Sequence, residues 1–152
     1  MKKAIFLLFL FIAIPAFLYF ALDRESIDIN EFRLNSGYQE VKLSEGITSY
    51  KDIGVKNNKV IVLVHGATFG SLAYEEYVNV FLENNYRVIT YDQYGRGYSD
   101  RVHTKVSIEL MERQLKELIE HCEVEDLILY GVSFGAAVVA KYASNNPEKI
   151  SF

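Results

Sequence analysis

A run of five apolar residues, Val-Ile-Val-Leu-Val at positions 60–64, constrains the fold of this 152-residue chain most strongly. Such a continuous run, rich in β-branched residues, is typical of a strand that is buried on both faces, as in a parallel sheet covered by helices. Two more apolar strands are expected at residues 87–91 and 127–130, with helical patterns between them. This alternation predicts an α/β fold with right-handed crossovers.

The segments between and after these strands carry the spacing of helices. Residues 71–84 are expected to form a helix whose first residue, a serine, is its N-cap. Apolar residues spaced by three and four predict a second helix from about residue 106 to 121, and Cys122 continues its stripe as a buried thiol. A helix of small residues is expected at 136–143, stopped by the Asn-Asn-Pro sequence at 145–147.

The length fits one folded domain, which we expect to cover residues 37–152. Two short strands, at residues 39–43 and 48–53, are expected to precede the first buried one, with a Ser-Glu-Gly turn between them. Residues 149–152 have the pattern of the beginning of a further strand, and residues 23–36 are mixed and polar, as in a spacer.

Residues 1–22 have the features of a membrane segment. Lys2 and Lys3 precede an apolar run over residues 4–22, which at about 1.5 Å per residue would span roughly 28 Å, close to the hydrocarbon thickness of a bilayer. The run ends in bulky residues rather than in the small ones that a cleavage site needs, so an uncleaved anchor is preferred to a cleaved signal peptide. The lysines predict that the rest of the chain lies outside the cytoplasmic face, anchored or, after cleavage, secreted.

Composition argues against several functions. The formal net charge of −4 argues against a nucleic-acid partner, because binding to phosphates requires a basic face. The single cysteine excludes an internal disulfide and a cysteine-based zinc cluster, and the three histidines form no ligand cluster, so we expect no metal and no other cofactor. The glycine-rich turns lack the G-x-G-x-x-G pattern of a dinucleotide-binding domain.

The sequence Gly-Val-Ser-Phe-Gly at residues 131–135 has the form G-x-S-x-G. It lies between an apolar strand and a helix, which is the context that a nucleophile elbow requires. In such a turn Gly131 and Gly135 would relieve crowding around Ser133, whose hydroxyl would stand above the sheet at the N-terminus of the next helix. We therefore expect Ser133 to be a catalytic nucleophile; the alternative is an ordinary tight turn between a strand and a helix.

The loop at residues 65–70, His-Gly-Ala-Thr-Phe-Gly, follows the first buried strand. With Gly66 allowing its turn, this loop can direct a backbone N–H towards the serine, where it would stabilise a developing negative charge together with the N–H of the residue after the nucleophile. The candidate donors are the amides of Ala67 and Phe134. His65 is tied to the strand end, so we expect it to organise the loop by hydrogen bonds rather than to act as a base.

A third motif follows the strand at residues 87–91. Residues 92–100, Asp-Gln-Tyr-Gly-Arg-Gly-Tyr-Ser-Asp, combine two glycines, an arginine and two acids, which suits a rigid loop held by charge-assisted hydrogen bonds. We therefore expect Asp92 to have a structural role and not to be a nucleophile.

Together the three motifs resemble the α/β-hydrolase superfamily, in particular its serine esterase and lipase branch and the related carbon–carbon bond hydrolases. The His-Gly pair at 65–66 matches the family's His-Gly after its third strand. Residues 92–99 match its Asp-x-x-Gly-x-Gly-x-Ser loop, with Tyr94 where many members have arginine, and Ser133 matches its nucleophile. The resemblance covers residues 39–152. It implies a three-layer fold with eight strands, of which this chain would hold those up to the fifth strand and the elbow helix.

The resemblance also implies a catalytic acid and a catalytic histidine from the sixth strand onward. No histidine follows Ser133 here, and the only later acid is Glu148, between the elbow helix and the next strand. His121 is expected at the opposite end of the sheet from the serine. His65 and His103 lie at the correct end, and of these His103 is the one in a loop that could approach the serine.

We therefore expect a serine hydrolase that acts on an ester or a similar acyl bond of a small molecule, inactive as this chain because the acid and the histidine are missing. The alternative is a non-catalytic, membrane-tethered binding module that has the same fold. Since the strand at residues 127–130 would be interior in the family's sheet, its outer edge is expected to be unpaired here, which favours aggregation.

Overall fold

The computed structural model describes residues 2–22 and 29–151. The chain divides into two compact units, Met1–Asn35 and Ser36–Phe152. The expected domain boundary at residue 37 lies one residue inside the second unit.

The first unit contains two helices. Helix α1 (Lys2–Leu22) includes Pro15, and helix α2 (Ile29–Leu34) lies within the region where the sequence predicts a spacer. Glu31 in the first turn of α2 and Arg33 in its last turn complement the helix dipole, which favours a helix in this polar segment. The remainder of the predicted spacer, residues 23–28, is outside the described residues.

The membrane anchor predicted over residues 1–22 is not supported. Among the helices formed by residues 2–22 and 29–151, none combines the length and the apolar character that crossing a membrane requires.

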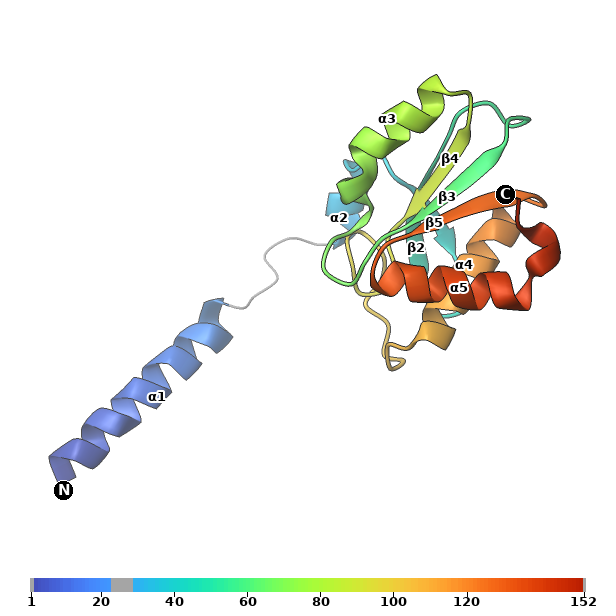
Figure 1. Ribbon diagram of the computed structural model, residues 1–152. Helices are drawn as coiled ribbons and strands as arrows, with labels where there is room; N and C mark the ends of the chain where they lie inside the picture. Colours follow the sequence, from blue (N-terminus) through green and yellow to red (C-terminus); the bar gives the residue numbers. More distant parts are fainter. Residues whose placement is uncertain (1, 23–28, 152) are drawn as a thin grey trace. The chain divides into compact units, whose positions relative to one another are not determined.

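The second unit is built on a mixed five-stranded sheet with the order β1-β2-β4-β3-β5 (Figure 1). Strands β1 and β2 pair antiparallel, β2 pairs antiparallel with β4, and β3 pairs parallel with both β4 and β5. The strands are β1 (Gln39–Lys42), β2 (Ile47–Ile53), β3 (Val60–Val64), β4 (Arg87–Tyr91) and β5 (Leu127–Gly131). The predicted parallel arrangement is therefore confirmed for the three strands that lead to the sequence motifs.

The register of the parallel strands defines two edges of the sheet. Val60 pairs with both Arg87 and Leu127, so the first residues of β3, β4 and β5 form what we call the amino edge. Val64 pairs with Gly131 at the other end of the strands. We call this end, with the loops that follow it, the carboxyl edge.

Helices cover both faces of the sheet, which gives three layers (Figure 1). Helix α3 (Glu75–Glu83) packs on one face, where Val78 joins a buried cluster with β3 and β4. Helices α4 (Ile108–His121) and α5 (Phe134–Asn145) pack on the other face, where the larger core cluster lies. The α/β-hydrolase architecture predicted from the sequence is confirmed in these layers.

The N-terminus of the first predicted helix differs from the expectation. A short 3-10 helix, η1 (Ser71–Tyr74), precedes α3, and Ser71 does not cap the α-helix. Its hydroxyl instead donates to Asp92 Oδ1 at 2.8 Å, which removes it from the role of a cap. By contrast, Ser107 does cap α4, since its hydroxyl accepts a hydrogen bond from the Leu110 N–H at 3.2 Å.

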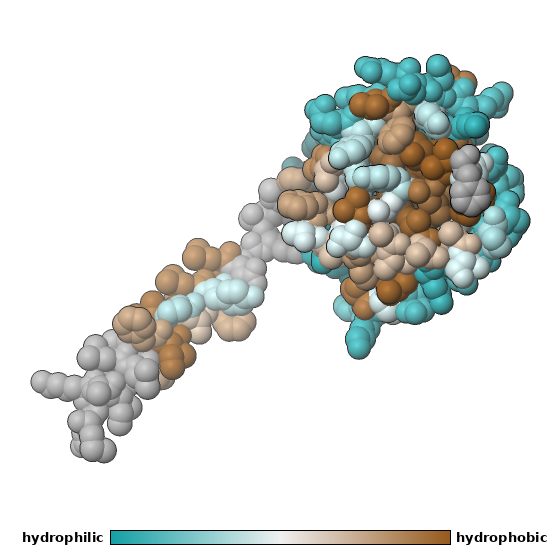
Figure 2. Space-filling view, viewed as in Figure 1, coloured by the Kyte–Doolittle hydropathy of each residue, from teal (hydrophilic) through white to brown (hydrophobic). Residues whose placement is uncertain are grey.

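Strand β5 lies at one end of the strand order, as its predicted unpaired edge requires. Its outer side carries a single parallel bridge between Leu127 and Ile150, next to a hydrogen bond from the Ser151 N–H to the Leu127 carbonyl at 2.9 Å. A short 3-10 helix, η2 (Pro147–Lys149), leads into this bridge. Figure 2 shows a hydrophobic area on the face where Figure 1 shows β3 and β5, with hydrophilic residues around it.

Candidate active site

Ser133 occupies a strained turn at the carboxyl edge. It lies directly between β5 and α5 with φ 54° and ψ −119°, a combination that side-chain-bearing residues seldom adopt. Its side chain is exposed and makes no capping hydrogen bond to α5. The sharp turn predicted at this position is therefore present, and it leaves the Ser133 hydroxyl uncommitted to the helix that follows.

The two glycines of the motif allow backbone segments to approach closely on both sides of the turn. A Cβ atom on Gly135 would lie 2.5 Å from the His65 carbonyl oxygen and still closer to that of Val64, at the end of β3. A Cβ atom on Gly131 would lie 2.7 Å from the carbonyl oxygen of Gly135. Larger residues at either position would push α5 away from the sheet, so the glycines fix where the helix begins.

The first amide of α5 lies at the turn, whereas the Gly135 and Ala136 amides that follow it donate to the carbonyls of Val132 and Ser133. Phe134 is the first helical residue, and an N–H group in this position has no acceptor within its own helix. The helix dipole adds partial positive charge at the same place. The Phe134 N–H, named from the sequence as a candidate donor, therefore lies in an environment suited to a negative charge.

The loop at residues 65–70 lies against the elbow. A Cβ atom on Gly66 would be 3.4 Å from the Ser133 Cβ and 3.3 Å from the carbonyl oxygen of Val132. Ala67 and Phe134 line one small pocket, of about 90 Å³, beside the turn. The structure thus brings the predicted serine, the predicted glycine and both candidate amide donors to one place.

His65 holds this loop through both of its ring nitrogens. Nδ1 donates to the Gly66 carbonyl oxygen at 2.6 Å, and Nε2 accepts from the Gln93 N–H at 2.9 Å. Burial lowers the pKa of His65 and so favours the neutral imidazole that this pattern requires. The Gly66 carbonyl and the Ala67 N–H belong to one planar peptide group, so His65 also sets the direction of the Ala67 N–H.

Arg96 gives the loop a second support. Its Nε donates to the Ala67 carbonyl oxygen and its Nη1 to the Gly95 carbonyl oxygen, the latter at 2.9 Å. The sequence predicts charge-assisted hydrogen bonds for the loop at 92–100, and Arg96 supplies them. The contact of Arg96 with Ala67 could not be predicted, because the loops at 65–70 and 92–100 are brought together by the pairing of β3 with β4.

Asp92 is buried and satisfied by neighbouring donors. Its Oδ1 accepts from the Ser71 N–H at 2.7 Å and its Oδ2 from the Tyr98 N–H at 2.9 Å, in addition to the Ser71 hydroxyl. Gly97, with φ 46°, passes so close that a Cβ atom there would overlap the Asp92 carboxylate. This arrangement fits the structural role predicted for Asp92.

Two buried glutamines, which the sequence analysis missed, complete the loop packing. Gln114 accepts from the Tyr94 N–H at 3.0 Å and donates to the Asp92 carbonyl at 3.1 Å, and Gln93 donates to the His65 carbonyl. In the sequence, this packing was indicated by Gln114 itself, which is a polar residue within the apolar stripe of α4. Such a residue is buried when a backbone group needs a partner.

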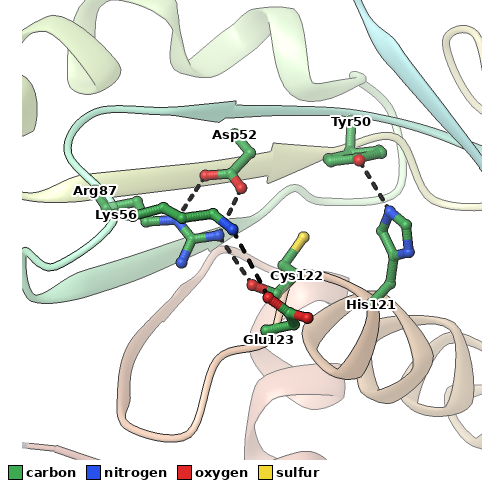
Figure 3. Close-up of polar contacts among 7 residues, drawn as sticks. All are labelled: Tyr50, Asp52, Lys56, Arg87, His121, Cys122 and Glu123. Carbon is green, nitrogen blue, oxygen red and sulfur yellow. Dashed lines mark hydrogen bonds and ion pairs between the residues drawn. The ribbon is translucent and has the colours of Figure 1, made fainter.

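The amino edge holds a second polar cluster, shown in Figure 3. Arg87 Nε donates to Asp52 Oδ1 at 2.8 Å and Nη2 to Asp52 Oδ2 at 2.6 Å, and Nη2 also donates to the Cys122 carbonyl at 2.9 Å. Cys122 is buried as predicted, and burial raises the pKa of its thiol to about 11. Lys56 pairs with Glu123 at 3.7 Å on the exposed side of this cluster.

None of the histidines in residues 29–151 makes a recorded hydrogen bond to Ser133. His121 Nε2 lies 3.0 Å from the Tyr50 hydroxyl, next to the amino-edge cluster, and so at the end of the sheet opposite Ser133, as predicted (Figure 3). His65 is occupied at both nitrogens. His103 lies in the exposed loop before α4.

The described part of the chain shows no group of three or more His, Cys, Asp or Glu side chains arranged to hold a metal ion. At the carboxyl edge these residues offer a hydroxyl, two backbone amides, the positive end of a helix and the guanidinium of Arg96.

A family model described as "Serine aminopeptidase, S33" matches residues 55–151. The chain belongs to this family of α/β hydrolases. The match includes the loop at 65–70, the loop at 92–100 and the elbow at 131–135, so all three motifs that carry the resemblance lie within it.

Curated relatives and solved structures agree with this membership. The chain is 30% identical over 121 residues to 2-hydroxy-6-oxo-2,4-heptadienoate hydrolase of Pseudomonas putida, covering 77% of this chain and 43% of that protein. It is 28% identical over 95 residues to a non-heme chloroperoxidase of Streptomyces lividans, covering 62% of this chain and 34% of that protein. The chain thus spans less than half the length of these relatives.

The thioesterase domain from the curacin biosynthetic pathway superimposes with a TM-score of 0.70 at 25% identity, covering 74% of this chain and 43% of that one. A hydrolase from Pseudomonas aeruginosa PA01 superimposes with a TM-score of 0.72 at 19% identity, covering 77% and 44%. The second likeness is evidence of the fold alone. The relatives and neighbours together support a hydrolase.

Proposed function

We propose that Ser133 is the nucleophile of a serine hydrolase that acts on an ester or a similar acyl bond of a small molecule. The observation that carries this proposal is the strained, exposed position of Ser133 between the loop at 65–70 and the first amide of α5. An ordinary turn has no need of a side-chain-bearing residue at φ 54° and ψ −119°, whereas a nucleophile must stand clear of the backbone to reach a substrate.

The proposed reaction follows from the groups around Ser133. The Ser133 oxygen attacks the substrate carbonyl carbon and loses its proton to a base, and the carbonyl oxygen becomes an oxyanion that accepts hydrogen bonds from the Ala67 and Phe134 amides. Collapse of this intermediate expels the leaving group, which takes up the proton, and leaves an acyl-serine. Water then attacks the acyl carbon, and the acid and the free serine are released.

The base in this scheme is the family's catalytic histidine, because a serine hydroxyl is a weak nucleophile without one. No histidine in residues 29–151 is recorded in contact with Ser133, and the resemblance assigns the catalytic acid and histidine to a later part of the fold. The proposal therefore concerns the whole protein, and it implies that residues 1–152 alone react slowly.

The names of relatives favour acyl chemistry without fixing the substrate. A relative from Acinetobacter calcoaceticus is named a bifunctional esterase/perhydrolase, and the curacin domain is named a thioesterase, both of which act on acyl groups. The Pseudomonas putida relative is named for the hydrolysis of a heptadienoate. An ester or thioester is the class that these names and the site share most directly.

A fluorophosphonate probe tests the proposal, because it modifies activated serines. We expect covalent labelling at Ser133 in the longest natural reading frame that contains residues 1–152. The Ser133→Ala variant should lose the label, and Ser44→Ala, at an exposed serine in the β1–β2 turn, should keep it. Residues 1–152 alone should label much more slowly. Absence of label at Ser133 in the folded, longest form would contradict the proposal.

A non-catalytic binding module with this fold is the second candidate. The absence of a recorded histidine contact to Ser133 among the described residues favours it. It predicts that the longest reading frame folds cooperatively, encodes no histidine after Ser133 and remains unlabelled by the probe.

We also propose that the α/β unit acts outside the cytoplasmic face, because two lysines ahead of the apolar run at residues 4–22 have the pattern of an export signal. A fusion to a reporter enzyme that is active only after export would test this location. Reporter activity is expected when the fusion point follows residue 22, and a silent fusion would contradict the proposal.

A further inference from the structure

We propose that the substrate carries a carboxylate, and that Arg96 binds this carboxylate in the pocket beside Ser133. The inference rests on the proposed function for the position of the reacting bond, since it places the charged end of the acyl group next to the oxyanion site. It adds a substrate class, a short acyl chain with an anionic end, which the serine chemistry alone does not specify.

Arg96 belongs to the same pocket as the two candidate amide donors. The pocket of about 90 Å³ is lined by Ala67 and Phe134, and Arg96 is part of its wall. Arg96 is exposed, so an incoming ligand can reach its guanidinium. A cation in the wall of the same pocket can hold an anionic group of the molecule whose carbonyl enters the oxyanion site.

The hydrogen bonds of Arg96 hold its side chain but do not neutralise its charge. Its Nε and Nη1 donate to the backbone carbonyls of Ala67 and Gly95, and no further partner of its guanidinium is recorded among the described residues. Nη2 therefore remains available as a donor to a carboxylate. Because two carbonyls already fix the plane of the guanidinium, little side-chain freedom is lost when a ligand binds.

Comparison with other arginines supports a free charge at this position. Arg87 and Arg113 each pair with a carboxylate, of Asp52 and Glu45 respectively. Arg96 has no carboxylate partner among the described residues. The same loop holds two acids. Asp92 is buried and its oxygens accept from neighbouring N–H and O–H donors, and Asp100 accepts from the Ile47 N–H at 2.7 Å. The positive charge of Arg96 is thus left for a ligand.

The rest of the pocket limits the size and polarity of that ligand. Its wall includes the side chains of Val106, Met111 and Phe134, which suit a short alkyl segment. A space of about 90 Å³ suits a short acyl segment. A short chain that links an acyl carbon to a carboxylate fits both the apolar wall and the cationic rim.

Equilibrium binding of two small probes to the Ser133→Ala variant of the longest natural reading frame tests the inference. The probes are monomethyl glutarate, which has an ester at one end and a carboxylate at the other, and methyl valerate, which has the ester alone. We expect monomethyl glutarate to bind at least about tenfold more tightly in 50 mM salt, which is the preference expected of one charge-assisted contact. The preference should shrink in 500 mM salt.

Two substitutions identify the residue responsible. Arg96→Gln should abolish the preference, and Arg96→Lys, which keeps the charge, should retain part of it. Both variants should stay folded with a thermal midpoint close to that of the parent, because the hydrogen bonds that Arg96 gives to Ala67 and Gly95 are exposed to solvent and contribute little to stability. A purely structural role in holding the Ala67 carbonyl would instead weaken the binding of both probes equally.

Equal affinity for the two probes would overturn the inference, as would binding of neither probe or a preference that survives in Arg96→Gln. These outcomes are separate from a failure of the proposed function. Binding is measured without the Ser133 hydroxyl, whereas fluorophosphonate labelling requires it. A carboxylate preference without labelling would keep the Arg96 assignment and reject the hydrolase.

Discussion

The two edges of the parallel strands differ in how completely their polar groups are satisfied. At the amino edge, Arg87 is buried, meets both oxygens of Asp52 and also binds the Cys122 carbonyl. At the carboxyl edge, Ser133 is held in a strained conformation, and the partners of Arg96 within residues 29–151 are backbone carbonyls. The first edge joins β2, β4 and the end of α4, and the second leaves donors and a hydroxyl available to a ligand.

In this sheet, the polar groups that stabilise the fold and those available to a ligand lie at opposite ends of the parallel strands. Parallel strands bring all their carboxyl ends to one side, so the loops there can be specialised while the other side is packed. Strands β3 and β4, which connect the two edges, are completely buried. The stability of this packed part of the fold offsets the strain at the carboxyl edge. Substitutions at the amino edge and at the carboxyl edge should therefore change the free energy of unfolding by different amounts.

The largest effect is expected from Asp52→Ala at the amino edge. The substitution leaves the buried Arg87 charge without its partner, which should lower the free energy of unfolding by about 3 kcal/mol. Urea unfolding measures the loss. Lys56→Ala is the matched control, since Lys56 and Glu123 form an exposed pair that should contribute about 0.5 kcal/mol or less. Similar losses for both variants would contradict the distinction between the buried and the exposed pair.

Gly135→Ala should have the next largest effect, at the carboxyl edge. Its Cβ atom would collide with backbone carbonyls of Val64 and His65, which cannot rotate away, so we expect a loss of about 2–3 kcal/mol. In Gly95→Ala, nothing lies within 4 Å of the new atom and only the positive φ of 78° is unfavourable. That control should lose about 1 kcal/mol. Equal thermal midpoints for the two variants would argue against close packing of α5 on β3.

Ser133→Gly should stabilise the protein, in contrast to the other substitutions. Glycine adopts a positive φ without strain, so unfolding should require about 1 kcal/mol more than in the parent. Ser133→Ala keeps the Cβ atom and should leave the stability nearly unchanged. If urea unfolding found the glycine variant no more stable than the alanine variant, the turn would not be strained.

The smallest effect is a dependence on pH that comes from His65. In the unfolded chain this histidine titrates near its ordinary pKa of 6.5, whereas burial lowers its pKa in the folded protein. Below pH 6.5 His65 therefore binds a proton in the unfolded state that it does not bind in the folded state. The free energy of unfolding thus falls as the pH falls. Urea unfolding at pH 7.5 and pH 5.5 measures the slope. His65→Gln should reduce it, and an unchanged slope in this variant would contradict the prediction.

Much of the carboxyl edge could be predicted from the sequence because its motifs are local. The elbow needs Gly131, Ser133 and Gly135 at fixed spacing, and an apolar strand and a small-residue helix flank them in the chain. The role of His65 as an organiser of its loop was also predictable, since a residue at the end of a buried strand has little freedom. These inferences depend on neighbours in sequence and not on the packing of distant segments.

The remaining features depend on pairs of segments that meet only in the folded sheet. Arg96 finds the Ala67 carbonyl, and Ser71 finds Asp92 instead of capping a helix, because β3 and β4 place their loops side by side. The bidentate pairing of Arg87 with Asp52 likewise follows from the register of β2 and β4. Spacing along the chain carries no signal for such contacts, so the satisfied amino edge was not predictable.

The contact of Gly135 with the end of β3 has a mechanical consequence. Helix α5 cannot slide towards or away from the sheet without displacing the strand that carries His65 and the loop behind it. We therefore expect the backbone of Ser133 and the amide of Ala67 to move together with the end of β3. A ligand that enters must adjust to the spacing between these two groups, and so the site selects for molecules whose reactive carbon already fits between them.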